Sequence, residues 1–173
     1  SVIEATARSI ADPQNHGYPP YRSTPELRKS MADWYKRTYR VELNPETQVL
    51  PLLGSKEGIL YVSMAFLNPG DGVLIPNPGY PAYTSVAKLL GARVHYYNLS
   101  ESTGWLPDLE QLKRQDLSGC KLMWVNYPHM PTGASADTRL FVQLADFARD
   151  KKILVCNDNP YSLVLNRDRK SVV

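Results

Sequence analysis

Short apolar segments alternate with amphipathic, helix-like segments along most of this 173-residue chain. Several of the apolar segments are continuously apolar rather than alternately apolar and polar, which is typical of strands covered on both faces. This alternation predicts an α/β fold of three layers, in which a mainly parallel sheet lies between two layers of helices. The expected strands are residues 47–52, 72–76, 93–99, 121–127 and 152–158, and the expected helices between them are residues 56–67, 81–91, 108–115 and 138–151.

One more amphipathic helix is predicted before the first of these segments. Thr24 provides a helix cap, and Pro25 stands in the first turn, where its missing N–H group is not needed. Residues 24–39 are therefore expected to form a helix with one apolar face. That face consists of Leu27, Met31, Trp34 and Tyr35.

Composition argues against several classes of function. The net charge is only +3, and the basic residues are scattered apart from residues 167–170, so we expect no nucleic-acid surface. No apolar run is long enough to cross a bilayer, and the first residues lack the pattern of a signal peptide, which favours the cytoplasm. Cys120 and Cys156 form neither a CxxC pair nor a metal-binding pattern, so we expect reduced thiols without a disulfide or a metal.

The loops after the expected strands carry residues suited to a ligand, and ligands of open α/β sheets bind beyond the carboxyl ends of the strands. GSKEG, residues 54–58, offers backbone N–H groups at a helix start, which suits an anion such as phosphate. PNPGYPAY, residues 76–83, offers an aromatic face, and NDNPY, residues 157–161, offers a carboxylate and a phenol. Each loop alone also fits a structural role, as a helix start, a packed aromatic or a hydrogen-bonded buried aspartate.

Five motifs in this order carry a specific resemblance: GYPPYRSTPELR, GSKEGI, PNPGYPAY, PTGA and DNPY. Over nearly its whole length the sequence resembles the large domain of the fold-type I pyridoxal-phosphate enzymes. Within them it is similar to the class I/II aminotransferases of the aspartate and LL-diaminopimelate groups. The resemblance implies that residues 1–173 are part of such a domain, that pyridoxal 5′-phosphate is the cofactor, and that the substrates are an amino acid and a 2-oxo acid.

The resemblance also implies roles for residues in the last and first of these loops. Asp158 is expected to pair with the pyridine nitrogen of the cofactor and to keep it protonated, so that the ring accepts electrons from the substrate. Tyr161 is expected to donate a hydrogen bond to the 3′ oxygen of the cofactor. Ser55 and Lys56 fall where the start of a helix holds the phosphate, and the side chain of Lys56 is not required for this.

Three tyrosines are assigned by the same resemblance. Tyr80 matches the aromatic residue that stacks on the cofactor ring, whereas Tyr83 is expected to be a neighbour in the pocket wall. Tyr18 matches a tyrosine that reaches the phosphate of the adjacent subunit. That role requires a homodimer.

Two positions depart from the family pattern. After the fourth strand the family pattern is P-N-N-P-T-G, and its second asparagine donates to the 3′ oxygen, but Met130 stands there in this chain. A thioether donates no hydrogen bond, so that oxygen would depend on Tyr161 and on His129 or a water. Ser23 stands where the family pattern often has glycine.

The resemblance further implies a Schiff-base lysine about one strand after the aspartate and tyrosine, and a substrate-binding arginine later still. The chain stops at Val173, and Lys170 lies only nine residues beyond Tyr161, without an intervening strand. We therefore expect a fragment that lacks the catalytic lysine and the small domain and is inactive by itself.

Two alternatives to an aminotransferase stay open at this point. A lyase or a decarboxylase uses the same scaffold and differs in which bond at the substrate Cα breaks. A non-catalytic sensor domain of a regulator is the other alternative. A nicotinamide-binding domain is not supported, because no G-x-G-x-x-G follows any of the expected strands.

Overall fold

The structure is a computed structural model that describes residues 1–164. The chain divides into two compact units, of which the first is Ser1–Leu52 and the second begins at Leu53. No helix in the described part of the chain is long and apolar enough to span a membrane.

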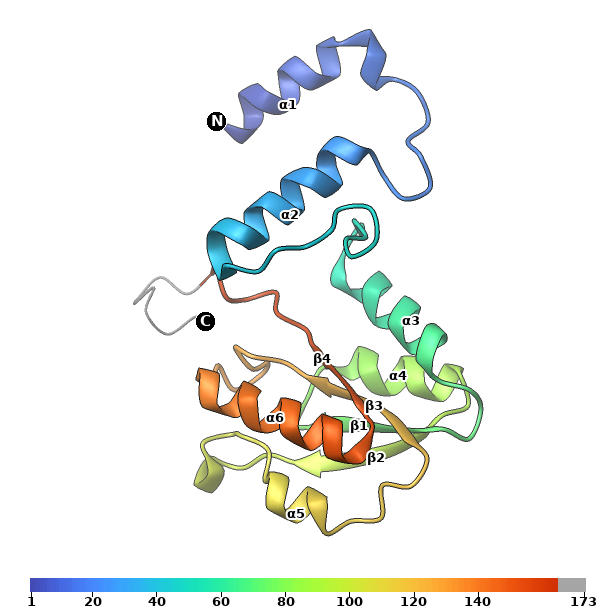
Figure 1. Cartoon of the computed structure of the whole chain (residues 1–173), viewed down its shortest axis with the longest axis vertical. Coiled ribbons are helices and arrows are strands. Elements are labelled where there is room, and N and C mark those ends of the chain that lie inside the picture. The colour runs from blue at the N-terminus through green and yellow to red at the C-terminus, as the bar shows by residue number, and fades with distance from the viewer. Residues whose placement is uncertain (165–173) are drawn as a thin grey trace. The chain divides into compact units, whose positions relative to one another are not determined.

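The second unit is built on a four-stranded sheet (Figure 1). Every pairing in the sheet is parallel, and the strands lie in the order β2-β1-β3-β4. The parallel α/β fold predicted from the sequence is therefore confirmed. The strands are β1 (Gly72–Asn77), β2 (Arg93–Asn98), β3 (Cys120–Val125) and β4 (Leu154–Asn157).

Helices precede and connect these strands, and side-chain caps fix where two of them begin. The Asp108 side chain accepts from Gln111 N–H at the start of α5, and the Asp137 side chain accepts from Leu140 N–H at the start of α6. The helices of this unit are α3 (Ser55–Phe66), α4 (Pro81–Leu89), α5 (Leu109–Lys113) and α6 (Thr138–Lys151), with a short 3₁₀ turn, η2 (Glu101–Thr103).

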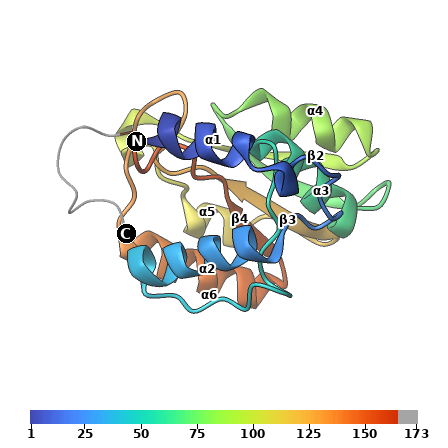
Figure 2. The same cartoon turned by 90° about the horizontal axis from the view of Figure 1, so that it is seen from above.

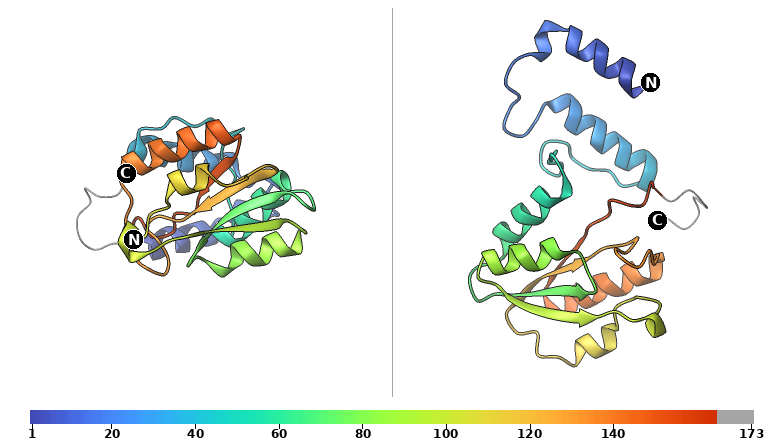
Figure 3. Two further views of the ribbon diagram at one scale, coloured as in Figure 1. Left: turned by 90° about the horizontal axis from the view of Figure 1, so that it is seen from below. Right: turned by 180° about the vertical axis from the view of Figure 1, so that it is seen from behind.

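The sheet separates two apolar cores, because successive side chains of a strand point to opposite faces. Val73 and Ile75 of β1 pack with α3 and α4, whereas Leu74 between them packs with α5 and α6. Strand β3 alternates in the same way from Leu122 to Val125, and all its residues except Lys121 are buried. Figures 2 and 3 show the two helical layers on opposite faces of the sheet, so the predicted three-layer arrangement is present.

The first unit contains α1 (Val2–Ala11), a 3₁₀ turn η1 (Pro13–Asn15) and α2 (Pro25–Tyr39). Helix α2 begins as predicted, since the Thr24 side chain accepts from Leu27 N–H and Pro25 occupies the first turn. Helix α1 was not predicted. Its signal is the reciprocal capping of Ser1 and Glu4, in which each side chain bonds to the main chain of the other residue.

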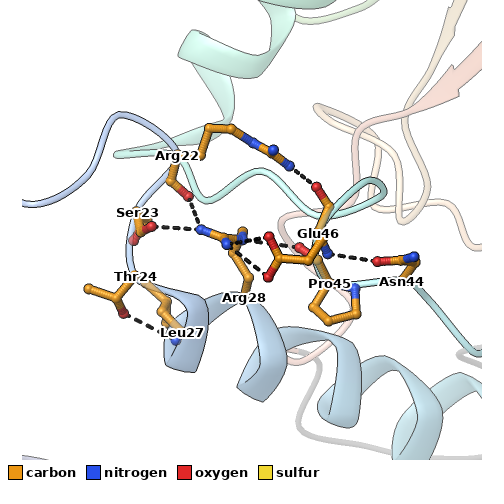
Figure 4. A network of polar contacts seen from close by, with 8 residues as sticks. All are labelled: Arg22, Ser23, Thr24, Leu27, Arg28, Asn44, Pro45 and Glu46. Carbon is orange, nitrogen blue, oxygen red and sulfur yellow. Dashed lines mark hydrogen bonds and ion pairs between the residues drawn. The ribbon is translucent and has the colours of Figure 1, made fainter.

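A polar cluster around Arg28 organises the chain on either side of α2 (Figure 4). Arg28 is 5% exposed, and its guanidinium donates to the carbonyl oxygens of Arg22, Ser23 and Pro45. Its Nη2 also donates to both carboxylate oxygens of Glu46, at 2.8 and 2.9 Å. Arginine suits this place because its planar fork presents several donors in fixed directions.

Ser23 has a φ of 63°, a left-handed conformation that costs an L-residue energy and costs glycine little. This gives a physical reason for the glycine that the family pattern often has there. The conformation also lets the Ser23 carbonyl oxygen accept from Arg28, at 2.7 Å.

The strand predicted at residues 47–52 is wrong, because no strand forms there and the sheet begins with β1. Pro51 has no N–H group to donate to a neighbouring strand. Instead, part of this segment faces α2 across an open groove of about 740 Å³ within the first unit. The groove is lined by Ser30, Met31, Trp34, Tyr35, Leu43, Gln48, Val49 and Leu50.

Candidate functional site

The predicted ligand-binding loops leave β1, β3 and β4 at the same edge of the parallel sheet. After β1 the chain continues to β2 on one side, and after β3 it continues to β4 on the other side. Loops that diverge in this way leave a crevice, which is where open α/β sheets bind ligands. The predicted loops therefore begin at the place where this fold offers a site.

Asp158 directly follows β4, and its main chain is tied to the end of β3. The Asp158 N–H donates to the Val125 carbonyl oxygen at 2.9 Å. The side-chain amide of Asn126 donates to the Asp158 carbonyl oxygen at 2.6 Å. The aspartate is therefore held on both sides of its Cα atom by the neighbouring strand.

The side chain of Asp158 is tied to a different element, helix α4. The Tyr83 hydroxyl donates to Asp158 Oδ2 at 2.9 Å. Asp158 Oδ1 accepts no hydrogen bond from residues 1–164. One carboxylate oxygen is thus engaged, and the other is free to meet a ligand.

The environment of Asp158 disfavours a lone negative charge. Partial burial raises the pKa of its carboxyl group, and the hydrogen bond from Tyr83 opposes this rise. A cation beside the free oxygen would stabilise the ionised form. The site is therefore suited to a ligand that presents a protonated nitrogen.

Tyr80 stands where the chain turns from β1 into α4. A side chain on Gly79 would meet the Pro76 carbonyl oxygen at 2.4 Å, so glycine permits the tight turn that precedes Tyr80. The Tyr80 ring meets the Tyr83 ring edge-on, with centroids 5.7 Å apart. Lys56 Nζ lies 6.0 Å from the centroid of the Tyr80 ring.

These contacts form a continuous series from the start of α3 to the end of β4. Lys56 contacts Tyr80, Tyr80 contacts Tyr83, and Tyr83 contacts Asp158. The structure thus connects Lys56, Tyr80 and Asp158, three of the residues that sequence analysis selected. Lys56 stays an exposed residue in the first turn of its helix.

The start of α3 has the features of an anion site. Its cap residue is Gly54, which supplies no side chain to the first N–H groups of the helix. Ser55 and Lys56 follow, and both are exposed. Glu57 N–H donates to the Gly54 carbonyl oxygen, and the Glu57 carboxylate accepts from Leu53 N–H. The N–H groups of Ser55 and Lys56, at the positive end of the helix dipole, are the ones that favour a phosphate there.

The turn after β3 is fixed by hydrogen bonds on either side of Met130. The Met130 N–H donates to the Asn126 side-chain oxygen at 2.8 Å, so Asn126 links this turn to Asp158. His129 is 2% exposed, and its Nδ1 lies 2.8 Å from Thr132 Oγ1. Burial lowers the pKa of His129, with the Pro78 carbonyl acting in the opposite direction, so a neutral imidazole is favoured.

Two of the predicted site tyrosines, Tyr161 and Tyr18, form no phenol hydrogen bond to these residues within the described part of the chain. Tyr161 lies in the turn after β4 and is 39% exposed. Tyr18 belongs to the first unit and is fully exposed. Lys170 lies outside the described residues. The roles of these residues stay predictions.

Tyr83 was predicted only as a neighbour in the pocket wall, and Asn126 was not among the predicted site residues. Tyr83 is not only a wall residue, since its side chain is 1% exposed and bonds directly to Asp158. Its partner lies 75 positions along the chain, so no local pattern could reveal the contact. The signal for Asn126 was its place directly after a buried strand, beside a turn with two prolines.

The site fits pyridoxal phosphate in its donor chemistry. A helix start without a side-chain cap suits the phosphate, and the half-buried Tyr80 ring suits stacking on the cofactor ring. The Asp158 carboxylate, whose Oδ1 accepts no hydrogen bond from residues 1–164, suits the ring nitrogen. The described residues 1–164 contain no group of three or more histidine, cysteine, aspartate or glutamate side chains that would hold a metal.

Comparisons with known proteins bear on the family and the fold of the chain. The family model of the class I and II aminotransferases matches residues 1–170. An LL-diaminopimelate aminotransferase of Dehalococcoides mccartyi is 45% identical over 161 residues, which are 93% of this chain and 42% of that protein. The relative from Aquifex aeolicus is 39% identical over 169 residues, which are 98% of this chain and 44% of that protein.

Solved structures show the same likeness. Alanine aminotransferase from Pyrococcus furiosus superimposes with a TM-score of 0.88 at 28% identity and covers 99% of this chain and 43% of its own. An aromatic aminotransferase from Pyrococcus horikoshii superimposes with a TM-score of 0.91 at 26% identity, and the match covers 99% of this chain and 46% of that protein. The chain spans less than half the length of these proteins. It belongs to the class I and II aminotransferase family.

Proposed function

We propose that the full-length protein is a pyridoxal-phosphate-dependent aminotransferase that moves an amino group between an amino acid and a 2-oxo acid. Residues 1–173 would then form part of its large, cofactor-binding domain. The observation that carries the proposal is the Asp158 carboxyl, which is fixed after the last strand of the parallel sheet and has one oxygen that no residue of 1–164 binds. Family membership supplies the reaction class.

Each residue of the site would bind a different part of the cofactor. Pyridoxal phosphate, when bound, supplies a ring that accepts the electrons released at the substrate Cα. Asp158 would hold a proton on the ring nitrogen, and Tyr80 would stack on the ring. The N–H groups at Ser55 and Lys56 would bind the phosphate, and Tyr161 would donate to the 3′ oxygen.

Asp158 is suited to its task by its surroundings. Partial burial makes the ionised form of the Asp158 carboxyl less favourable, and its pKa is raised for this reason. A protonated ring nitrogen offsets that cost, and the carboxylate in turn stabilises the positive ring. Protein and cofactor would therefore each hold the other in the charged form.

The lysine that binds the cofactor covalently and the small domain would come from the protein beyond Val173. Tyr18 would reach the phosphate of the partner subunit in a homodimer, and the enzyme would act in the cytoplasm. LL-diaminopimelate is the first amino donor to test, because the relatives that match 93% or more of this chain carry that name. Alanine is the second, because of the Pyrococcus furiosus structure.

The half-reaction of the full-length enzyme with an amino acid tests this function. Asp158→Ala should slow the spectral change of the bound cofactor at least about 100-fold, which corresponds to about 2.7 kcal/mol of barrier. Asp146→Ala is the matched control, because that aspartate is exposed on α6 and forms an ion pair with Arg149 there. Unchanged rates in the Asp158→Ala enzyme would contradict the proposal.

The position of the covalent lysine gives an independent test. The full-length holoenzyme is reduced with borohydride, and labelled peptides are mapped by mass spectrometry. The proposal predicts one stoichiometrically labelled lysine beyond residue 173. Stoichiometric labelling of Lys56 or Lys170 would show instead that the site is organised differently.

A further inference from the structure

Tyr83 is the largest of the most deeply buried side chains, and it points its only polar atom at the candidate site. It lies on α4, the helix that follows β1, and stands 75 residues before Asp158 in the sequence. Nothing in the family resemblance assigned it more than a place in the wall. Its contact with Asp158 therefore asks for an explanation of its own.

The packing around Tyr83 leaves its ring little freedom. The ring stacks parallel on Trp124 of β3, with centroids 5.2 Å apart and an interplanar angle of 6°. The Tyr80 ring packs edge-on against the Tyr83 ring, with centroids 5.7 Å apart and an interplanar angle of 82°. A tyrosine held on two sides in this way fixes the direction of its O–H group.

Asp158 is consequently fixed from two independent directions. Its main chain bonds to Val125 and Asn126 at the end of β3, and its side chain bonds to Tyr83 from α4. The main-chain bonds set where the residue stands, but they leave the carboxyl group free to rotate. The hydrogen bond to Oδ2 removes that freedom and decides where Oδ1 lies.

We propose that Tyr83 is a positioning residue, which holds Asp158 by Oδ2 so that Oδ1 is presented to the protonated ring nitrogen of pyridoxal phosphate. The inference rests on the proposed function for the identity of the ligand. It adds that the orientation of the carboxyl group is set by α4 and not by the strand that carries Asp158.

The charged state of the pair follows from the same contacts. Tyr83 stays neutral at physiological pH, because burial and the adjacent Asp158 charge raise its pKa far above the usual range. It therefore always has a proton to donate, and this lowers the pKa of Asp158 against the effect of burial. Among the described residues, the other titratable groups that interact with Tyr83 are the phenols of Tyr80, Tyr97 and Tyr161, and the thiol of Cys156 packs against the same apolar cluster.

Tyr83→Phe in the full-length protein removes only the hydroxyl and leaves the stacked ring. Without cofactor, the pKa of the Asp158 carboxyl should rise further, because its ionised form loses its donor. Carboxyl ¹³C NMR titration measures this directly, with Asp158→Asn used to assign the signal. Tyr97→Phe is the matched control, since Tyr97 is also buried but donates to the Trp124 carbonyl oxygen at 2.6 Å. An equal Asp158 pKa in both variants would overturn the proposal.

Cofactor binding then separates this inference from the function on which it rests. The dissociation constant of pyridoxal phosphate should increase about tenfold in Tyr83→Phe, as expected for a lost hydrogen bond to a charged group. In the Asp158→Asn background the same change should have no further effect, because Tyr83 acts through Asp158. Equal effects of Tyr83→Phe in both backgrounds would reduce Tyr83 to a packing residue. Unaltered binding in Asp158→Asn alone would instead refute the assigned role of Asp158.

Discussion

The two units of the chain are stabilised in different ways. The unit that begins at Leu53 has apolar cores on both faces of its sheet, with residues such as Leu122 and Met123 fully buried. The first unit, Ser1–Leu52, buries only Arg28 and Ala32, and its most connected residue is a charged one. The sheet unit depends on apolar packing, and the first unit depends on a polar cluster.

This difference bears on how each unit relates to function. Layers of buried apolar side chains fix the strand ends and hence the positions of Tyr83 and Asp158. The first unit leaves apolar side chains exposed and has an open groove along α2, whereas the Arg28 guanidinium is buried and hydrogen-bonded. The comparison predicts that substitutions in the two units will differ in size and in chemical cause.

Removing a buried side chain from the sheet unit should have the largest effect. Phe147→Ala empties a position that is 1% exposed between α6 and the sheet, and should cost about 3–5 kcal/mol of unfolding free energy. Met31→Ala, on the half-exposed face of α2, should cost about 1 kcal/mol. Urea unfolding of the full-length protein compares them. Equal losses would show that the α2 groove is a buried core in the whole enzyme.

Breaking the polar cluster should have the next largest effect. Arg28→Met leaves the carbonyl oxygens of Ser23 and Pro45 without their donor, at a cost of about 2 kcal/mol. Hydrogen exchange should quicken in the segments around Ser23 and Glu46. Arg37→Met, an exposed position on the same helix, serves as the control. If both variants behave alike, the cluster does not stabilise the first unit.

The smallest effect is expected at the left-handed residue before α2. Ser23→Gly should stabilise the first unit by up to about 1 kcal/mol, because glycine adopts a positive φ without the steric cost of a Cβ atom. The same substitution at Ser30, inside α2, should instead destabilise it by about 0.5 kcal/mol. Thermal unfolding of the full-length protein distinguishes the two signs. Destabilisation by both would contradict the strain assigned to Ser23.

Sequence patterns identified the parts of the fold that local chemistry determines. The apolar runs of β1 to β4 and the capped helices α2 and α6 were predicted within a few residues of their observed ends. Residues 47–52 do not form the predicted strand, because apolar and β-branched residues form a strand only where a partner strand pairs with them. Their apolar character serves the groove beside α2 instead.

In the candidate site too, local sequence patterns predict some features and tertiary packing determines the others. Asp158, Tyr80 and the start of α3 could be selected from the sequence because each follows a strand or opens a helix, and their roles stay predictions. The engagement of Tyr83 and Asn126 with Asp158 depends on which strands are neighbours in the sheet. That order is set by tertiary packing, and no motif in the sequence records it.

The central claim is that Asp158 binds the protonated ring nitrogen of pyridoxal phosphate. NMR of the full-length enzyme loaded with cofactor labelled with ¹⁵N at the ring nitrogen measures the protonation of that atom directly. The account predicts a protonated nitrogen in the wild-type enzyme at neutral pH and an unprotonated one in Asp158→Asn, with the cofactor still bound. The same protonated signal in both proteins would contradict it.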